Sequence, residues 1–452
     1  MSSEWVKMRL GDFIDLKRGY DLPKKSRSAG PIPLVSSAGV SDQHSEAKVR
    51  GPGVVTGRYG TIGDVFYIEE DFWPLNTTLY VRDFKGNDPR FTYYFLKTID
   101  YLQYSDKAAV PGVNRNHLHM AEISVPKSVD EQRRIASVLS CLDDKIEAND
   151  TINQTLEQMA QAIFKSWFVD FEPVKAKIAA LEAGGSAEDA LLGAMQAISG
   201  KGEAELTRLQ AEQPEQYAEL RATAELFPSA MQDSELGEIP EGWTIAPFLS
   251  IARLDTTSVK PAQDPEKAWE HYSIPAFDEG ATPAFETGAD IKSNKYKVYP
   301  TAVLSSKLNP HFPRTWIPDV QNPDAAICST EFMQFVPLEP QHRAFIAGMI
   351  TSEPFQSGIM IRVTGSTGSR QRAQPKQVAA MDVILPKSEL RAVYSQHTEA
   401  MYRMQSKNIW QAQSLASLRD TLLPKLLSGE LSVSDAEYQM TEEELIPQEE
   451  IN

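Results

Sequence analysis

The pattern of apolar positions alternates between strand-like and helix-like stretches, and the same order occurs twice along the chain. Each copy opens at a tryptophan, Trp5 or Trp243, and reaches a strand-like run that ends in Pro-Lys-Ser, at 126–128 and 386–388. After each Pro-Lys-Ser the apolar spacing becomes helical. The clearest strand-like runs are 54–56, 65–68 and 78–81, then 302–306, 326–329 and 332–336, followed by weakly helical stretches at 89–104 and 340–361. The sequence predicts two copies of one α+β block, each leading into a helix.

Both helices carry a 4-3 apolar spacing, from Ile135 to Trp167 and from Leu390 to Leu422. A seam of about five heptads exceeds the usual globular helix and needs a partner of equal length, which the other copy supplies. We expect an antiparallel pair of helices about 40 residues and about 60 Å long. The alternative is that each is a core helix inside its own block. The residues expected to pair the helices are Leu139, Leu142, Ile146, Asn149, Asn153, Leu156, Met401, Met404, Asn408 and Leu415.

The polar residues in the middle of both seams are expected to fix the register of the pair. Ser128-x-x-Glu131 predicts a capping box at the start of the first helix, and Glu172-Pro173 is expected to end it. The Ala-, Glu- and Gln-rich stretch that follows predicts short helices in an acidic connector without a site. The last residues, with Glu442-Glu443-Glu444, predict a poorly ordered acidic tail.

Length and composition limit the class of protein. The chain has 452 residues, 41% of them hydrophobic and 24% charged, which is typical of a soluble protein with several domains. The N-terminus has no apolar signal core, and no apolar run approaches the roughly 18 residues of a membrane span. Cys141 and Cys328 are far apart without a Cys-x-x-Cys pair, so neither a disulfide scaffold nor a zinc cluster is expected. A cytoplasmic protein without a metal site is predicted.

The net charge of -17 argues at first against a nucleic-acid partner. The acidity is nevertheless unevenly distributed. Residues 1–128 carry 17 basic and 15 acidic side chains, and residues 243–387 carry 14 of each. The excess of acidic residues belongs to the helices, the connector and the tail, so the two α+β blocks remain compatible with DNA binding.

Glycine-rich loops supply the candidate DNA contacts. Gly57-x-x-Gly60-x-x-Gly63 has neither dinucleotide-binding nor P-loop spacing, but it would expose Arg58 and Tyr59, which can bind guanine or phosphate and stack. An ordinary hairpin with a surface arginine explains the same residues equally well.

In the second copy, the loop 365–372 combines small and hydroxyl residues with two arginines, which suits a phosphate or a base edge. Its counterpart in the first copy is 110–116. The full set of expected DNA-binding residues is Lys24, Lys25, Arg27, Arg58, Tyr59, Asn76, Thr77, Asn114, Arg115, Lys292, Lys307, Asn309, Arg314, Ser366, Thr367, Ser369, Arg370, Gln371 and Arg372.

Motifs for catalysis are not found in the sequence. Asn309-Pro310-His311-Phe312 is only partly similar to the Asn-Pro-Pro-Phe/Tyr motif of amino-methyltransferases, and no glycine-rich S-adenosylmethionine loop follows a strand. His117-x-His119 has no further ligand at zinc spacing. Neither a hydrolase Gly-x-Ser-x-Gly nor a His-Glu-x-x-His occurs. A binding protein without catalytic residues is predicted.

The ordered motifs, together with the duplicated layout, resemble the specificity subunit of type I restriction–modification systems along nearly the whole chain. They are Trp5 with Leu10-Gly11-Asp12, the Gly57–Gly63 loop, Asp130-Glu131-Gln132-Arg133-Arg134-Ile135, Phe168-Val169-Asp170-Phe171-Glu172-Pro173, 236–243 and 422–431. Two features depart from the family pattern. The second helix begins Ser388-Glu389-Leu390-Arg391 without Glu-Gln, and the connector is long.

The resemblance implies an α+β protein with two target recognition domains joined by two long antiparallel coiled-coil helices, as a pseudo-twofold internal repeat. The corresponding segments are recognition domain 1 (1–128), the first conserved long helix (129–171), the acidic helical connector (172–242), recognition domain 2 (243–387), the second conserved long helix (388–430) and the acidic tail (431–452). Each recognition domain would read one half of a split asymmetric DNA site, and the helices would set the spacer between the halves.

The resemblance also implies protein partners. Two methylation subunits would pack on the helices and two restriction subunits could join the complex. S-adenosylmethionine, ATP and magnesium would reside in those partners, and this chain would hold no cofactor and catalyse no reaction. Two other functions remain open from the sequence: a coiled-coil scaffold without DNA specificity, and a stand-alone DNA methyltransferase or nuclease. A bipartite footprint would exclude the first, and turnover by the isolated chain would establish the second.

Overall fold

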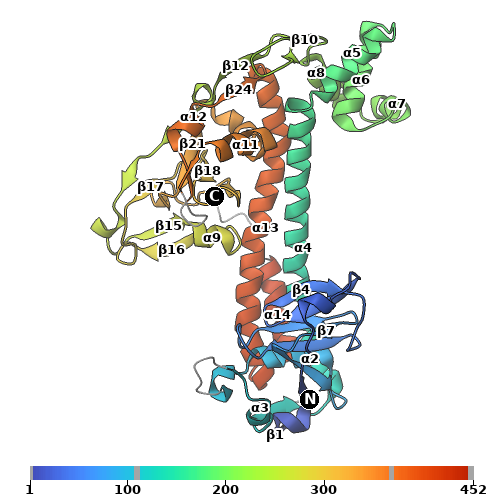
Figure 1. The fold of residues 1–452 in the computed structure, drawn as a ribbon, viewed down its shortest axis with the longest axis vertical. Helices are drawn as coiled ribbons and strands as arrows, with labels where there is room; N and C mark the ends of the chain where they lie inside the picture. The colour runs from blue at the N-terminus through green and yellow to red at the C-terminus, as the bar shows by residue number, and fades with distance from the viewer. Residues whose placement is uncertain (1–3, 106–111, 366–370, 446–452) are drawn as a thin grey trace. The chain divides into compact units, whose positions relative to one another are not determined.

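The computed structural model describes residues 4–105, 112–365 and 371–445 (Figure 1). The chain divides into two compact units. The first combines residues 1–147 with 412–452, and the second comprises residues 148–411. Two long helices, α4 (Val129–Phe168) and α13 (Ser388–Ser428), contribute residues to both units. In the described parts of the chain, no helix is long and apolar enough to span a membrane.

The first unit contains the first predicted α+β block. Its elements are β1 (Trp5–Arg9), α1 (Leu10–Phe13), β2 (Asp15–Arg18), η1 (Lys24–Ser26), β3 (Ile32–Ser36), β4 (Gly39–His44), β5 (Gly53–Gly57), β6 (Val65–Ile68), β7 (Trp73–Pro74), β8 (Thr78–Asp83), α2 (Pro89–Lys97), η2 (Tyr101–Tyr104), α3 (Arg115–His119) and β9 (Glu122–Pro126). The strands form an antiparallel sheet β2-β8-β5-β6, a sheet β4-β3-β7 and the pair β1-β9. The strand-like runs at 54–56, 65–68 and 78–81 are thus confirmed as strands.

The second unit contains the second predicted α+β block. Its elements are β12 (Thr244–Pro247), η3 (Phe248–Ser250), β13 (Ala252–Asp255), β14 (Ser258–Val259), η4 (Pro261–Gln263), β15 (Ala268–Tyr272), α9 (Ile274–Asp278), β16 (Ala284–Thr287), β17 (Lys295–Lys297), β18 (Val303–Ser306), β19 (Thr315–Trp316), β20 (Ala326–Cys328), β21 (Phe332–Pro337), η5 (Pro340–His342), α10 (Arg343–Thr351), α11 (Glu353–Ile361), β22 (Val363–Thr364), β23 (Arg372–Ala373), α12 (Pro375–Ala379) and β24 (Asp382–Leu385).

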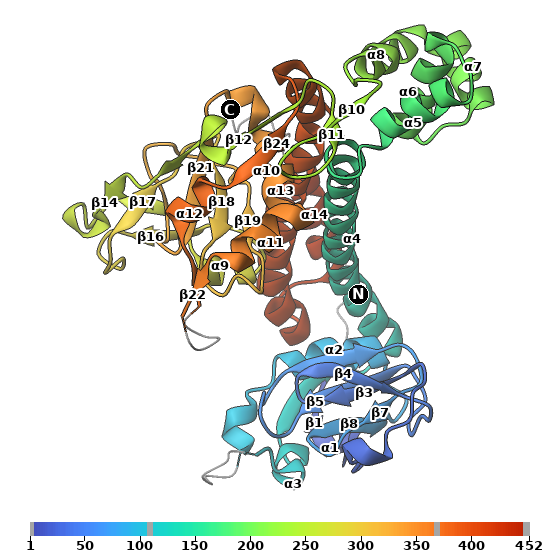
Figure 2. The same ribbon diagram turned by 45° about the horizontal axis from the view of Figure 1, so that its top comes forward.

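Strand pairing shows how the two blocks correspond (Figure 2). The sheet β13-β21-β18-β19 has the strand order of β2-β8-β5-β6, and β12-β24 matches β1-β9. In each block one strand has an antiparallel and a parallel neighbour: β3 between β4 and β7, and β15 between β16 and β20. The strands β14 and β17 extend this second sheet and have no counterpart in the three-stranded sheet of the first block. The second copy is longer than the first by 22 positions between its tryptophan and the proline of its Pro-Lys-Ser, and this added length includes β14 and β17.

The helices α4 and α13 pack antiparallel, and polar side chains pair them within the second unit. Asn149 Nδ2 donates to Gln411 Oε1 at 3.1 Å, and Asn408 Nδ2 donates to Asn153 Oδ1 at 2.9 Å. Gln405 Nε2 donates to the Asn153 carbonyl at 2.9 Å. Asn149 is buried, and Asn153, Gln405 and Asn408 are partly buried, so a shift in register would leave several polar groups without a partner. The expected polar middle of the seam is confirmed.

The seam of α13 differs from the prediction at Met404, which is 51% exposed. The buried face of α13 in this region includes Tyr394, which belongs to the predicted spacing, together with Thr398 and Tyr402, which do not. A straight helix with 3.6 residues per turn drifts away from a strict seven-residue repeat, and the large tyrosine rings occupy the space against α4. Tyr394 Oη donates to the Ala160 carbonyl at 3.1 Å.

Aromatic rings join both helices to the second block. Phe164 and Phe168 of α4 lie 5.5 and 5.3 Å, centroid to centroid, from the Tyr394 ring of α13. Phe345 of α10 lies 5.1 Å from Phe168. Gly348 makes this approach possible, since a Cβ there would lie 2.5 Å from Phe164 Cδ2. The C-terminal part of α4 is consequently part of the core of the second block.

Within the first unit, Asp143 of α4 connects three elements. Its carboxylate accepts hydrogen bonds from Tyr94 of α2 and Arg419 of α13, each at 2.7 Å. Apolar contacts surround this link, because Leu139 and Leu142 of α4 and Leu422 of α13 are fully buried in one core. The remaining predicted pairing residues, Ile146, Leu156, Met401 and Leu415, are partly buried.

The two long helices begin differently, as the sequence indicates. Gln132 is 1% exposed and bonds the Asp88 amide, Asn87 and the Pro126 carbonyl, which fixes the start of α4 on the first block. Ser128 Oγ accepts from the Glu131 amide at 3.4 Å. At the start of α13, Ser388 donates to Glu339 at 3.3 Å and Arg391 lies 4.0 Å from the same carboxylate. These contacts replace the missing glutamine.

The connector is a small folded element with its own core. It contains α5 (Glu172–Glu182), α6 (Ala187–Ser199), α7 (Glu203–Glu212), α8 (Pro214–Glu225), β10 (Met231–Gln232) and β11 (Ile239–Pro240). Leu191, Met195 and Leu206 are buried together, and a capping box at Ser186 starts α6. Glu172-Pro173 starts α5 as well as following the end of α4. The predicted short helices are present, and they pack against one another.

The C-terminal segment differs from the expected unstructured tail. Residues Val433–Leu445 form helix α14, and Val433 and Ala436 are buried in the core of the first unit. Small apolar residues among the acidic ones give this segment a face that can pack, so its net charge alone was misleading. Residues 446–452 lie outside the described part of the chain.

The polar seam generates a prediction about stability. Asn153→Leu should lower the free energy of unfolding by about 1–2 kcal/mol, because Asn408 would lose its acceptor while remaining partly buried. The double variant Asn153→Leu, Asn408→Leu should recover most of this loss, since both polar groups are then removed. Urea unfolding measures both effects, with the exposed Gln158→Leu as the control. A double variant less stable than Asn153→Leu would contradict the proposed pairing.

Candidate nucleic-acid interface

In the first block, the structure brings together the two loops that the sequence singled out. The loop after β5 meets the segment before α3 through the antiparallel bridge between Tyr59 and Gly112, and the Val113 amide donates to the Arg58 carbonyl at 3.0 Å. Gly112 permits this contact, because a Cβ would lie 2.2 Å from Tyr59 Cε1. Gly57 has a similar role, since a Cβ there would lie 1.8 Å from the Thr61 carbonyl oxygen.

The side chains at this junction form a cationic and aromatic pair. The Arg58 guanidinium lies over the Tyr59 ring, 4.5 Å from its centroid, and Tyr59 is 36% exposed. No described carboxylate forms an ion pair with Arg58. The guanidinium therefore keeps its hydrogen-bond donors for a phosphate or a guanine edge, while the ring offers a stacking face.

The neighbouring Asn114 has a structural function that the sequence did not indicate. It is the N-cap of α3, and its Oδ1 accepts hydrogen bonds from the Asn116 and His117 amides at 3.0 and 3.5 Å. Arg115 is exposed, with Nη2 3.2 Å from Asn116 Oδ1. Asn114 thus orients the first turn of α3, and Arg115 presents the charge at this place.

The second block repeats the juxtaposition at the same place in its topology. Leu308 and Arg372 form an antiparallel bridge, the Asn309 amide donates to the Gln371 carbonyl at 3.0 Å, and the Ala373 amide donates to the Lys307 carbonyl at 2.9 Å. The loop after β18 thereby meets the hairpin β22-β23, just as the loop after β5 meets the segment before α3. Asn309 adopts a positive φ of 47° at this turn.

Arg372 differs from Arg58 because it is paired within the chain. Its Nε lies 3.0 Å from Glu331 Oε2, and this hydrogen bond raises the pKa of Arg372. The Arg372 side chain is 42% exposed, so the pair holds it in one orientation while leaving part of it accessible. Lys307 is partly buried beside it.

Two residues near this junction were not predicted as contacts. His311 Nε2 lies 2.8 Å from Gln371 Oε1, and Phe312 is 68% exposed at the tip of the same loop. The Asn-Pro-His-Phe run was noticed only as an incomplete methyltransferase motif. Phe312 follows Asn309 and Pro310, which favour a turn, and this position in a turn could have indicated an exposed ring.

The other predicted residues are more dispersed. Lys24, Lys25 and Lys292 are exposed, and Lys292 donates to the Ala289 carbonyl. Ion pairs inside the chain hold Arg27, to Asp42 at 2.8 Å, and Arg314, to Asp278 at 2.6 Å.

Asn76 and Thr77 adjoin the first junction in the chain. Asn76 bonds Asp21, and the Thr77 carbonyl accepts from the amides of both Arg58 and Tyr59. Thr77 therefore supports the first loop through its backbone. Ser366, Thr367, Ser369 and Arg370 lie outside the described residues.

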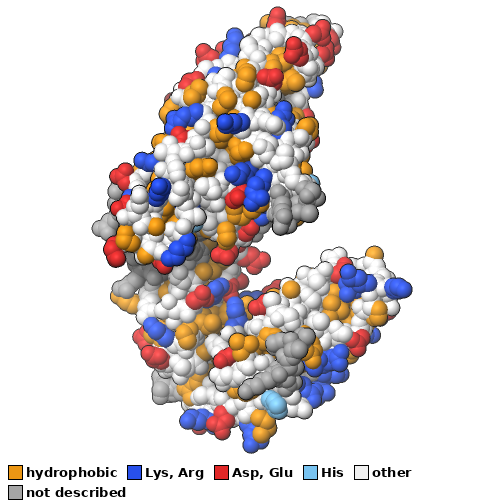
Figure 3. All heavy atoms as spheres, turned by 60° about the vertical axis from the view of Figure 1, so that its left-hand side comes forward, with side chains coloured by type: hydrophobic (Ala, Val, Ile, Leu, Met, Phe, Trp, Pro, Cys, Tyr) orange, Lys and Arg blue, Asp and Glu red, His pale blue; other side chains and the backbone are white. Residues whose placement is uncertain are grey.

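Surface charge does not form one continuous basic area on the face shown in Figure 3, where Lys and Arg occur in small groups among Asp and Glu. In the described ranges, no group of three or more His, Cys, Asp or Glu side chains could hold a metal ion. His119 Nε2 accepts from the Leu16 amide at 3.0 Å, and burial lowers the pKa of His119. This histidine supports the fold of the first block.

Comparisons with known proteins test these inferences. Residues 2–158 match the model of the type I restriction modification DNA specificity domain. The type I restriction enzyme HindI specificity subunit of Haemophilus influenzae is 28% identical over 372 residues, which are 76% of this chain and 77% of that protein. The MjaIX specificity subunit of Methanocaldococcus jannaschii is 38% identical over 109 residues, 23% of this chain and 25% of that protein.

A solved structure supports the fold alone. The S subunit of a type I restriction–modification system from M. genitalium aligns with 94% of this chain and 96% of its own, at a TM-score of 0.55 and 15% identity. The resemblance based on the motifs is confirmed, as is the α+β fold with two long helices. The sequence left three functions open: a DNA specificity subunit, a coiled-coil scaffold, and a stand-alone methyltransferase or nuclease. The matches support the first of these, a non-catalytic specificity subunit. The chain is thus similar to the specificity subunits of type I restriction–modification systems along most of its length, and its residues 2–158 match the DNA specificity domain of that family.

Proposed function

We propose that each block reads one half of a bipartite, asymmetric DNA site and that the two long helices set the unread spacer. The observation that carries this proposal is the repeated loop junction, Tyr59 with Gly112 in one block and Leu308 with Arg372 in the other. Two copies of the same loop junction that present different side chains could recognise two different half-sites. A helix of 40 residues is about 60 Å long, which is nearly two turns of B-DNA at about 34 Å each.

The proposal includes the partners of the complex. Two methylation subunits would dock on the long helices, with two restriction subunits in the full complex, and the system would act in the cytoplasm. S-adenosylmethionine, ATP and magnesium would be bound by those subunits, whose methylation step requires the target adenine to leave the stack. This chain would supply DNA sequence recognition and would bind no cofactor.

Protection footprinting of the chain with its methylation subunits tests the reading of two half-sites. Two protected segments separated by an accessible spacer are the expected result. One continuous footprint that follows salt concentration alone would contradict the proposal. Methylome sequencing of the host would identify the split motif.

Single substitutions should act on one half-site each. Arg58→Ala should weaken binding by about 1–3 kcal/mol and relax recognition of one half-site, whereas Lys307→Ala should affect the other. Competition binding with DNA mutated in either half measures this separation. Lys7→Ala removes a charge from strand β1 and serves as the control. If both variants changed recognition of the same half-site, the assignment of one block to each half would be wrong.

The close contact at Gly112 generates a further prediction. Gly112→Ala should displace the Tyr59 ring, because the added Cβ would lie 2.2 Å from Tyr59 Cε1, and binding to the first half-site should fall by about tenfold, as in Tyr59→Ala. The double variant Tyr59→Ala, Gly112→Ala should bind no more weakly than Tyr59→Ala alone, since the clash is then absent. Additive losses would show that Gly112 acts independently of the ring.

We expect the ion pair between Arg372 and Glu331 to lower the affinity for unrelated DNA and to improve the discrimination between specific and unrelated DNA. Glu331→Gln should free one guanidinium, which steepens the dependence of log K on log salt by about 0.9 and tightens binding to unrelated DNA. Specific binding should lose discrimination by roughly tenfold, because Arg372 is no longer oriented. Asp382→Asn removes the same charge elsewhere in the block as a control. Unchanged discrimination would mean that Glu331 does not position Arg372.

A further inference from the structure

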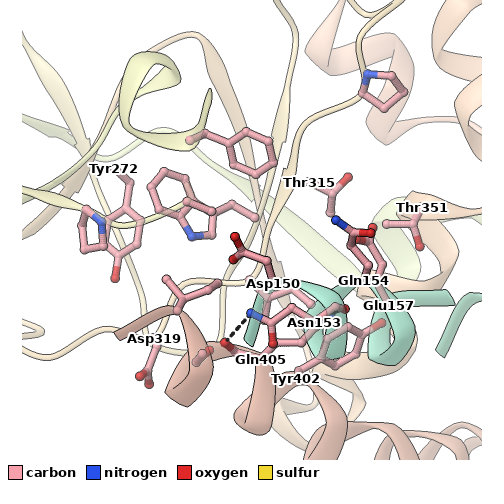
Figure 4. A pocket seen from close by; sticks show the side chains of 18 of the residues that line it. Asp150, Asn153, Gln154, Glu157, Tyr272, Thr315, Asp319, Thr351, Tyr402 and Gln405 are labelled. Carbon is pink, nitrogen blue, oxygen red and sulfur yellow. Dashed lines mark hydrogen bonds between the residues drawn. The ribbon is translucent and has the colours of Figure 1, made fainter. Parts of the chain in front are cut away.

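A pocket in the second unit has a chemistry unlike that of the DNA-reading loops. Its volume is about 520 Å³, and it is enclosed by α4 and α13 on one side and by loops of the second block on the other (Figure 4). Asp150 and Glu157 come from α4, Tyr402 and Trp410 from α13, and Trp316 and Asp319 from the block. This volume falls within the range of about 300–1,000 Å³ typical of ligand sites.

The charges around the pocket have one sign. Three carboxylates line it, and no Lys or Arg is among its lining residues. Glu157 accepts from Gln161 at 3.0 Å and Asp319 from Gln321 at 3.1 Å, both neutral donors. Asp150 forms no hydrogen bond or ion pair with any described residue. Asp150 and Glu157 therefore contribute negative charge to the pocket without forming an ion pair with a described cation.

The buried Arg343 interacts electrostatically with Asp319 but forms no ion pair with Asp150 or Glu157. Arg343 directs Nη2 to the Pro318 carbonyl, and its Nη1 lies 4.0 Å from Glu399. Both groups lie outside the lining of the pocket. Arg343 thus supports the wall behind Asp319 without entering the pocket.

Aromatic rings supply the remaining walls. Trp316 is 5% exposed and packs edge to face against Tyr272, with ring centroids 4.7 Å apart. Tyr402 and Trp410 face the same space from α13. Indole and phenol faces attract cations, most strongly where water is excluded. Aromatic walls combined with unneutralised carboxylates select a cation that also has a flat or apolar body.

This chemistry excludes DNA as the occupant, because phosphates would be repelled by the carboxylates. It matches the guanidinium of an arginine side chain, which can bind a carboxylate and stack on an aromatic ring at once. A buried Arg in an aromatic pocket is also a common centre of protein interfaces.

We propose that this pocket receives an arginine side chain of a methylation subunit and thereby anchors that subunit on the face shared by α4, α13 and the second block. The inference rests on the proposed function in one respect, that the chain assembles with methylation subunits. The anchor would be separate from the DNA-reading loops, so assembly and sequence recognition would depend on different residues of this chain.

The test uses the full chain and its methylation subunit without DNA. The double variant Asp150→Asn, Glu157→Gln should weaken their association by about tenfold or more in isothermal titration calorimetry, and the remaining affinity should depend less on salt. Glu147→Gln removes a carboxylate of α4 that does not line the pocket and should leave association unchanged. Circular dichroism confirms that the variants keep their helices.

A second measurement identifies the occupant. A photo-crosslinking residue at Trp410 should link to an arginine-containing segment of the methylation subunit, and changing that arginine to alanine should reproduce the loss of affinity. Unchanged association of the double variant, or tighter binding of DNA in the pocket, would overturn the inference. A bipartite footprint from a complex that assembles normally despite the double variant would refute the anchor while leaving the proposed function intact. Failure of the wild-type chain to bind the subunit would refute both.

Discussion

The antiparallel packing of α4 against α13 is the constraint on which the remaining structure depends. Each helix contributes to the cores of both units, so neither block is complete without segments from distant parts of the chain. Polar pairs around Asn153 specify the register at a cost in stability, and apolar and aromatic contacts supply the stability itself. A slip of one turn would unpair the polar layer and separate Asp143 from Arg419.

The two loop junctions, Tyr59 with Gly112 and Leu308 with Arg372, depend on backbone contacts more than on side-chain packing. In both blocks, two loops far apart in sequence are joined by a short antiparallel bridge, which fixes the place where variable side chains are presented. Glycine at 57 and 112 permits the close approach in the first block. Such a framework would allow the side chains at the junctions to change while the loops keep their positions, as the proposed reading of two different half-sites would require.

Acidic character has different meanings in different parts of this chain. In the second block, Glu331 orients an arginine and Asp278 holds another in an ion pair, so these carboxylates organise the basic residues. Around the pocket beside α4, Asp150 and Glu157 form no ion pair with a described residue. The acidic residues behind the net charge of -17 therefore lie in internal ion pairs, on exposed helix faces and around the pocket.

The sequence by itself determined the repeat, several strands of each block, the long helices and the loops that form the junctions, because these depend on local periodicity and on glycine and proline positions. Only the tertiary structure decided that Tyr402 packs in the seam while Met404 is exposed, that Arg314 is held by Asp278, that Asn114 caps a helix, and that residues 433–445 form a packed helix. The physical reason is that partner choice depends on which distant side chains reach the same volume. The apolar pattern along the chain specifies which face of a helix or strand is buried, and the tertiary structure decides which residues pack against that face.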